Sequence, residues 1–217
     1  YTYGPLRAVV SGQINGTTIE RDGLMQNGRA AERSYGSSGV AKFLGGGGKA
    51  TLSWRINPSN VLTLNSSYQR EAPLAYNSFV ANRIKNDFVH GLSTEGIFNN
   101  ELSYSLTTAR FTARLSGYYT RFTDQVEQTA FYNDSEARFT YLTMRGVEKE
   151  HYGIEAAAIW NVTSALSFTF IGSMGDALYT NNPYATITYE SQDEVSMTYT
   201  NPVTKKQDAL LVIADGC

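Results

Sequence analysis

The chain has 217 residues, a formal net charge of −2 and a hydrophobic fraction of 41%. A net charge this close to zero argues against a nucleic-acid partner held by bulk electrostatics. The sequence has no run of 18 apolar residues, which excludes a transmembrane helix. Membrane-spanning strands would escape that test, because their apolar residues alternate with polar ones.

Aromatic residues and glycine are abundant, with 15 Tyr, 10 Phe and 19 Gly. Aromatic side chains favour strands and also the headgroup level of a membrane. The only cysteine is Cys217, so no disulfide forms within the chain. The chain opens at Tyr1 without a basic or apolar leader, and we expect it to be an internal piece of a longer protein.

Alternating apolar and polar residues predict a series of β-strands. Period-two alternation places successive side chains on opposite faces, so each predicted strand has one apolar and one polar face. The predicted strands span residues 6–14, 50–56, 62–69, 101–106, 111–128, 150–160 and 166–174. The predicted long loops span residues 15–39, 73–96 and 133–149, and residues 191–217 fit the strand template poorly.

Short turns join these strands in pairs. The first turn, residues 57–60, contains Pro58 and two asparagines, which supply turn dihedrals; residues 107–110 and 161–164 form the next two turns. Short turns at one end and long loops at the other are typical of outer-membrane barrels, whereas a propeller blade would need four short strands per repeat. We therefore predict an all-β antiparallel meander of about seven to eight strands, part of a large transmembrane β-barrel.

The last predicted hairpin, residues 150–174, shows the two faces most clearly. Its strands hold about the 9–11 residues that a tilted strand needs to cross a bilayer. We expect the large apolar side chains to form one convex surface that faces lipid. This set includes Leu102, Tyr104, Leu115, Leu166, Phe168 and Phe170. We also expect the first and last strands to keep unpaired edges.

Several segments resemble TonB-dependent receptors of the bacterial outer membrane, in the Gram-negative branch of SusC-like proteins. Residues 117–124, Gly-Tyr-Tyr-Thr-Arg-Phe-Thr-Asp, are similar to a strand of that family, and Gly146-Val147 with His151-Tyr152-Gly153-Ile154-Glu155 is similar to the entry of the next strand. Residues 21–29 and 81–86 resemble two loops of the same receptors. The order of the segments agrees, and the similarity extends to about residue 190.

The resemblance implies a fold and a function. Such receptors have a 22-stranded barrel, an N-terminal plug domain and a TonB box that precedes the plug. Residues 1–217 would be a partial barrel from the C-terminal half, without plug or closing strands, and residues 191–217 a loop that leads into further strands. The protein would import a siderophore, a cobalamin or a glycan across the outer membrane and would perform no covalent chemistry. Its partners would be outer-membrane lipid, its own plug, the TonB complex and, as a further candidate, a surface lipoprotein.

Two other functions are compatible with the pattern of strands. One is an unplugged porin or adhesin barrel. The other is a soluble carbohydrate-binding β-protein that uses tyrosine-rich surfaces. A plug domain upstream in the same reading frame would distinguish the transporter from the porin.

No motif in the sequence predicts catalysis, a cofactor or a metal site, and no residue can be assigned to ligand binding. The glycines at 45–48 precede Lys49, but a phosphate-binding loop would need Gly where Phe43 stands and Ser or Thr where Ala50 stands. We expect a flexible strand entry there, with a bulge or a close contact.

Histidines and charged residues give no stronger signal. His90 and His151 are far apart in sequence, whereas zinc and iron need clustered ligands. Four charged residues fall on the polar face of predicted strands, where they would line the lumen and either hold a plug by ion pairs or contact water. They are Arg55, Glu101, Arg114 and Glu155.

Overall fold

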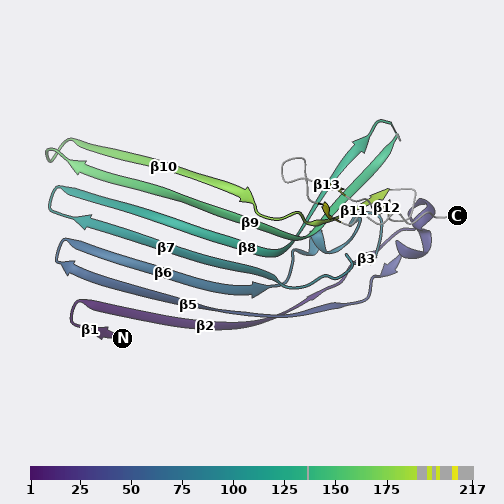
Figure 1. The fold of residues 1–217 in the computed structure, drawn as a ribbon, viewed down its shortest axis with the longest axis horizontal. Helices are drawn as coiled ribbons and strands as arrows, with labels where there is room; N and C mark the ends of the chain where they lie inside the picture. Colours follow the sequence, from purple (N-terminus) through teal and green to yellow (C-terminus); the bar gives the residue numbers. More distant parts are fainter. Residues whose placement is uncertain (136, 190–194, 197–198, 201–206, 210–217) are drawn as a thin grey trace.

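The computed structural model of the chain describes residues 1–135, 137–189, 195–196, 199–200 and 207–209. A ten-stranded antiparallel sheet forms the body of the molecule (Figure 1). Its strands are β1 (Thr2–Tyr3), β2 (Leu6–Ile19), β5 (Ala41–Asn57), β6 (Asn60–Glu71), β7 (Glu95–Thr107), β8 (Phe111–Asn133), β9 (Arg138–Asn161), β10 (Ser167–Tyr179), β11 (Tyr184–Tyr189) and β12 (Val195–Ser196). Neighbours in the sheet from β1 to β9 follow chain order, and the strands that the structure describes do not close into a barrel. The predicted all-β antiparallel meander is confirmed.

The connections differ at the two ends of the sheet. Short turns join β5 to β6, β7 to β8 and β9 to β10 at one end (left in Figure 1). In the first of these turns, Asn57 Oδ1 accepts hydrogen bonds from Ser59 N at 3.0 Å and from Asn60 Nδ2 at 2.8 Å. The opposite end carries two long loops, residues 20–40 and 72–94. The predicted asymmetry of short turns and long loops is therefore present.

The long loops contain only short regular elements. The first loop holds β3 (Asp22–Gly23), the 3₁₀ turn η1 (Gly28–Arg33) and β4 (Gly36–Ser37), and the second holds the 3₁₀ turn η2 (Ala75–Ser78). Two small strands near the end of the chain, β13 (Tyr199–Thr200) and β14 (Gln207–Ala209), pair with each other. The rest of the predicted final loop, residues 191–217, lies largely outside the described residues.

The prediction of a long loop over residues 133–149 is wrong. Strands β8 and β9 stay paired as far as Asn133 and Arg138, and they project past their neighbours as a long hairpin (Figure 1). The alternation of apolar and polar residues is interrupted here because the register between β8 and β9 shifts twice. Asp124, at φ 58°, and Gly146, at φ 67°, mark the two irregular positions. Such bulges insert residues into one strand and break period two locally.

Two strand boundaries also differ from the prediction. Strand β2 continues to Ile19, inside the predicted first loop, and β5 begins at Ala41, before the glycine run. Gly45 to Gly48 therefore lie within a strand that is paired on both sides, and not at a flexible strand entry. The close contact expected there is present, because a Cβ at Gly47 would lie 2.6 Å from the Tyr68 carbonyl oxygen.

Each side of the sheet has its own chemistry. Residues directly opposite each other on neighbouring strands share a face. One such row is entirely apolar or glycine and crosses six strands: Leu52, Leu64, Leu102, Gly117, Ile154 and Met174. The neighbouring row on the other face carries hydroxyls and one carboxylate: Ser53, Thr63, Ser103, Ser116, Glu155 and Ser173.

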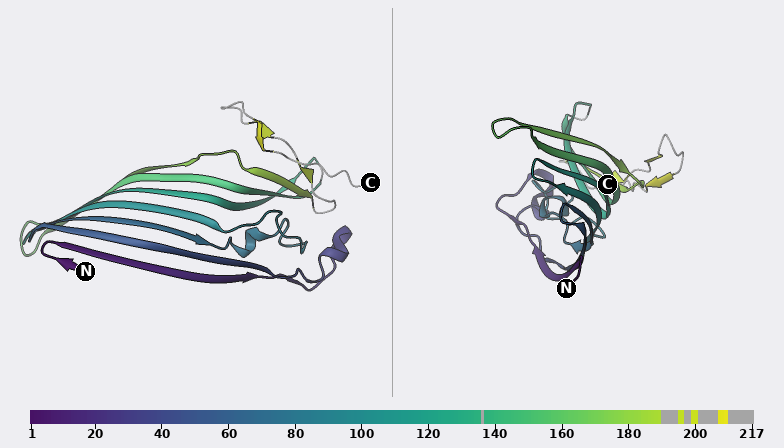
Figure 2. Two further views of the ribbon diagram at one scale, coloured as in Figure 1. Left: turned by 60° about the horizontal axis from the view of Figure 1, so that its bottom comes forward. Right: turned by 90° about the vertical axis from the view of Figure 1, so that its left-hand side faces the viewer.

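The apolar face is the convex one. Leu102 and Leu115 are both 51% exposed, whereas the neighbouring Ser103 and Ser116 are only 4% and 6% exposed. Side chains converge on the concave side of a curved sheet and spread apart on the convex side, so this difference gives the direction of curvature. Figure 2 shows the bend of the sheet from the side and from one end. The shared face predicted for Leu102, Tyr104, Leu115, Phe168 and Phe170 is confirmed by the register, while Leu166 lies just before β10.

The outer edges of the sheet remain largely open. Among the described residues, β10 pairs only with β9. Strand β2 pairs with β5, and among the described residues its other side is covered only over residues 6–8, by β1 and Tyr1. Strand β11 lies in line with β10 along β9, and Asn181 fills the interval between them. Its Oδ1 accepts from Glu148 N at 2.9 Å and its Nδ2 donates to Gly146 O at 2.6 Å, so one side chain replaces a strand there.

The glycine run provides a test of the sheet geometry. An alanine Cβ at Gly47 would lie 2.6 Å from Tyr68 O, whereas at Gly48 its nearest neighbour would be Ser11 O at 3.6 Å. We expect Gly47→Ala to lower the free energy of unfolding by on the order of 1–3 kcal/mol, as overpacking does, and Gly48→Ala to change it little. Denaturant midpoints of the two variants measure the difference. Equal midpoints would show that the β5–β6 pairing relaxes without cost.

Candidate functional site

A hollow of about 640 Å³ lies on the concave face of β7, β8, β9 and β10. Polar side chains from β7 and β8 form much of its wall, including Asn99, Glu101, Arg114 and Thr120. Glu155 of β9 lies in the same hollow. The predicted polar face is therefore confirmed for Glu101, Arg114 and Glu155. Arg55, next to the β5–β6 turn, is exposed on the same face outside this hollow.

An ion pair orders one side of the hollow. Arg114 Nη2 lies 2.5 Å from Glu101 Oε1, and Arg114 Nε donates to Ser116 Oγ at 3.1 Å. The Arg114 side chain is 55% exposed, so the pair contributes at most about 1 kcal/mol to stability. Its main effect is to fix the orientation of the guanidinium group in the hollow.

A tyrosine packs over two glycines beside this ion pair. Gly153 of β9 and Gly175 of β10 are directly opposite each other, and Tyr118 of β8 is opposite Gly153. A Cβ at Gly153 or Gly175 would approach Tyr118 Oη to 2.8 or 2.7 Å. The absence of these Cβ atoms therefore makes room for the Tyr118 side chain on the concave face.

A buried carboxylate lies at the loop end of β7. Glu95 is 7% exposed and accepts a hydrogen bond from Val126 N at 3.0 Å. Val126 follows the irregular position at Asp124, where β8 leaves its pairing with β7. Glu95 thus satisfies a backbone donor that the end of the ladder leaves without a strand partner.

Burial raises the pKa of the Glu95 carboxyl above its usual value. The neighbouring charge of Glu71 raises this pKa further, whereas the hydrogen bonds from Val126 N and Gln125 and the charge of Lys149 lower it. The net shift is upward, because desolvation of the charged form is the largest contribution.

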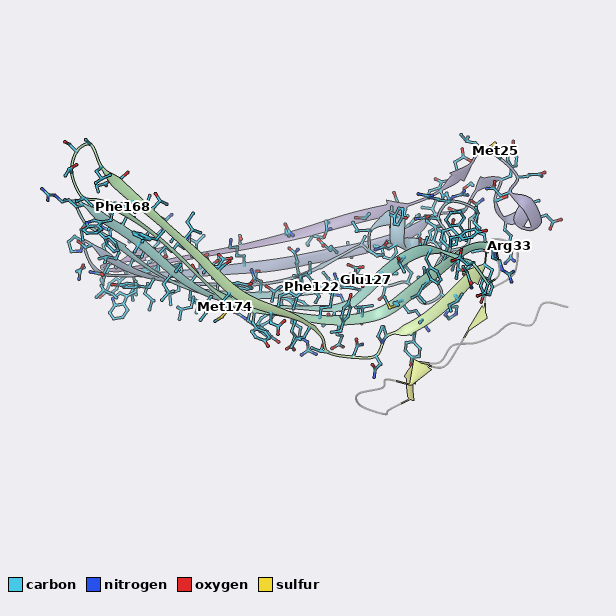
Figure 3. All side chains as sticks on the ribbon, turned by 90° about the horizontal axis from the view of Figure 1, so that it is seen from above. Met25, Arg33, Phe122, Glu127, Phe168 and Met174 are labelled. Atoms are coloured by element: carbon cyan, nitrogen blue, oxygen red, sulfur yellow. The ribbon has the colours of Figure 1, made fainter. Side chains whose placement is uncertain are left out.

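A second cluster joins β8, β9 and β10 near the same level. Lys149 Nζ lies 2.5 Å from Glu127 Oε1, and Tyr179 Oη donates to Glu127 Oε2 at 2.9 Å. The same ammonium lies 5.7 Å from the centre of the Phe122 ring and 5.8 Å from that of Tyr179, within cation–π range. Figure 3 shows Phe122 and Glu127 midway between the turn end and the loops. The hydrogen bond to Glu127 and burial raise the pKa of Tyr179.

The histidines do not come together. His90 is exposed in the second loop, whereas His151 lies on β9 with its ring centre 5.1 Å from that of Phe122. In the part of the chain that the structure describes, no group of three or more His, Cys, Asp or Glu side chains could hold a metal ion.

Sequence reasoning missed the clusters of Glu95 and Glu127. Both clusters depend on the irregular positions in β8 and β9. The register shifts there bring Val126 beside Glu95 and Glu127 beside Lys149, and a regular register would not bring these residues together. The signal in the sequence is the loss of alternation after Thr123, within the strand that is predicted to continue to residue 128.

Among the described residues, no helix is long and apolar enough to cross a membrane. No protein-family model matches the chain, and no curated protein matches it either. The evidence on function therefore comes from the two faces of the sheet and the clusters described above.

The raised pKa of Glu95 predicts a pH dependence. Because the folded state binds this proton more tightly than the unfolded state, wild-type protein should gain stability relative to Glu95→Gln as the pH falls. The gain should develop between the raised folded pKa and the unfolded value of about 4.3. Melting temperatures of both proteins from pH 7 to pH 4 measure it. The opposite trend would mean that the bond from Val126 N outweighs burial.

Proposed function

We propose that the chain is the outer-membrane β-barrel portion of a TonB-dependent active transporter. The observation that carries the proposal is the continuous convex apolar face, which no second layer covers among the described residues. Monomeric soluble proteins rarely expose contiguous apolar patches beyond a few hundred Å². A lipid environment would cover this face without any further protein layer.

The dimensions of the apolar face fit a bilayer. On β8 the convex apolar positions extend from Phe111 to Tyr119, and on β9 they extend from Tyr152 to Trp160. Each run is nine residues long, close to the 9–11 residues of a tilted membrane-spanning strand.

Aromatic side chains mark both ends of these runs. At the turn end, Trp160 and Phe168 lie on the same face with ring centres 6.3 Å apart. At the loop end, Tyr119 and Tyr152 are directly opposite each other. Aromatic girdles at the two interfaces are typical of transmembrane barrels.

In this proposal the concave face is the wall of the lumen. Its hydroxyls and the Arg114–Glu101 pair would face the plug or water, and the loops 20–40 and 72–94 would lie outside the cell. The barrel wall is a scaffold that performs no covalent chemistry. Its partners are lipid, a plug domain and, through that domain, the TonB complex; the ligand is a scarce solute such as a siderophore, a cobalamin or a glycan.

The segments that resemble the receptor family support the proposal through their contacts. Two resemble family strands, and they meet where Tyr118 packs against Gly153. Two others resemble family loops, and they meet where Arg21 donates to the carbonyl oxygen of Asn82. Segments distant in sequence therefore come together in pairs.

Charge placed on either face tests the proposal. Ala156 lies at the centre of the nine-residue convex run of β9, and the adjacent Ala157 lies on the concave face; both are exposed. In lipid, arginine near the middle of the outward face costs roughly 2–4 kcal/mol, whereas the lumen tolerates charge. We expect Ala156→Arg to lower the stability of the full-length protein in lipid vesicles by about that amount, and Ala157→Arg to lower it far less. Equal effects would contradict the lipid assignment.

Lipid-phase labelling tests the same assignment without relying on stability. Phe168 pairs with Trp160 on the convex face, and Thr169 pairs with Ile159 on the other face. A cysteine at position 168 should react with a lipid-soluble label, whereas one at 169 should not. Equal protection of both positions would favour a soluble β-protein. A plug domain upstream in the gene would then separate the transporter from an unplugged porin.

A further inference from the structure

A single arginine connects the two long loops. Arg21, at the start of the first loop, donates through Nε to Asn82 O at 3.0 Å and through Nη2 to Arg83 O at 3.2 Å. Its Nη1 donates to Ser34 O at 3.2 Å and to the side-chain oxygen of Asn86. All four bonds come from the planar guanidinium group that distinguishes arginine from lysine, and three of them reach the second loop.

Asn86 completes the connection from the other side. Its Nδ2 donates to Gly36 O at 2.9 Å and to Tyr35 O at 3.3 Å, and its backbone N donates to Arg33 O at 2.6 Å. The contact is closely packed, since Ser34 is fully buried and Asn86 is 9% exposed. A Cβ at Gly23 would overlap the Ser34 carbonyl, so that glycine lets the first loop fold against Arg21.

The second loop has its own attachment to the sheet. Val80 and Val89 form a buried cluster with Val126 of β8, and Ala81 and Ile84 form another with Tyr141 of β9. Hydrogen bonds support these clusters: Asn77 Nδ2 donates to Val126 O at 2.8 Å, and Gln128 Nε2 donates to Phe79 O at 2.6 Å. The second loop is therefore anchored to the β8–β9 hairpin by apolar packing as well as by polar contacts.

The first loop has a different kind of attachment. The contacts that hold it to the rest of the described structure run mainly through Arg21, Asn86 and the Arg33–Asp87 ion pair, all to the second loop. Its apolar residues Leu24 and Met25 are 84% and 71% exposed and form no core. Figure 3 shows Met25 and Arg33 both at the loop end, separated from each other.

We propose that Arg21 and Asn86 latch the first loop onto the second, so that both loops form one unit carried by the β8–β9 hairpin. A molecule that contacts Leu24 or Met25 then acts on the hairpin through the latch. Arg21 is a positioning residue here, because the four hydrogen bonds described for its guanidinium group all go to residues of the two loops. The latch does not depend on the proposed transport function.

Hydrogen–deuterium exchange of the full-length protein tests the latch. In Arg21→Ala and in Asn86→Ala, we expect the amides of residues 22–38 to exchange at least about tenfold faster, which corresponds to about 1.4 kcal/mol. The amides of residues 76–89 should change less than about twofold, since the two apolar clusters remain. Arg83→Ala is the matched control. It removes the same charge at the same contact but keeps the carbonyl that Arg21 uses, and it should leave both segments unchanged.

A variant on the anchoring side tests the order of attachment. Val89→Ala weakens the cluster under the second loop, so exchange should become faster in residues 76–89 and in residues 22–38 together. The proposal is overturned if Arg21→Ala leaves residues 22–38 protected, or if Val89→Ala loosens the second loop alone. Either result would mean that the first loop has an anchor of its own.

Discussion

The rest of the structure depends on one constraint: a single-layer sheet has two faces and needs a partner for the apolar one. Backbone hydrogen bonds are satisfied between neighbouring strands, so the sheet does not need a second layer to pair its main chain. Its convex side chains do need one, because protein domains normally bury apolar faces between two packed layers. Among the described residues that layer is absent; in the function proposed above, lipid supplies it over a height of nine residues per strand.

The curvature of the sheet follows from where side chains are missing and where the register shifts. Gly47 lies where a Cβ would collide with the neighbouring β6 backbone, and Gly153 lies where a Cβ would collide with Tyr118. The irregular positions at Asp124 and Gly146 redirect the β8–β9 hairpin away from β7. The freed backbone groups are then satisfied by side chains, Glu95 for Val126 and Asn181 for Gly146 and Glu148. The concave hollow and the loop end of the β8–β9 hairpin take their shape from these few positions.

The sequence predicted the strands wherever period two is unbroken. The hairpin of β9 and β10 pairs residue for residue from Asn161 to Lys149, and its alternation alone identified both faces. Prediction failed over residues 133–149, because two register shifts interrupt the pairing of β8 with β9 and polar residues at the start of β9 resemble a loop. The Arg114–Glu101 pair was predictable only as two charges on one face, since its partners belong to different strands. Arg21 and Asn86 are 65 residues apart, and no local pattern reports a contact between loops over such a separation.

The loop end and the sheet below it are stabilised by different interactions. The buried hydrophobic clusters that the structure describes lie under the second loop, against Val126 and Tyr141, as in a water-soluble protein. The sheet below has an exposed apolar convex face and a polar concave face, whereas a soluble sheet packs its apolar face on a core. The loop end therefore keeps its own packing in water whatever surrounds the sheet, whereas the sheet depends on what covers its convex face. Because the β8–β9 hairpin runs through both regions, a shift of the loops would reach the sheet through this hairpin first.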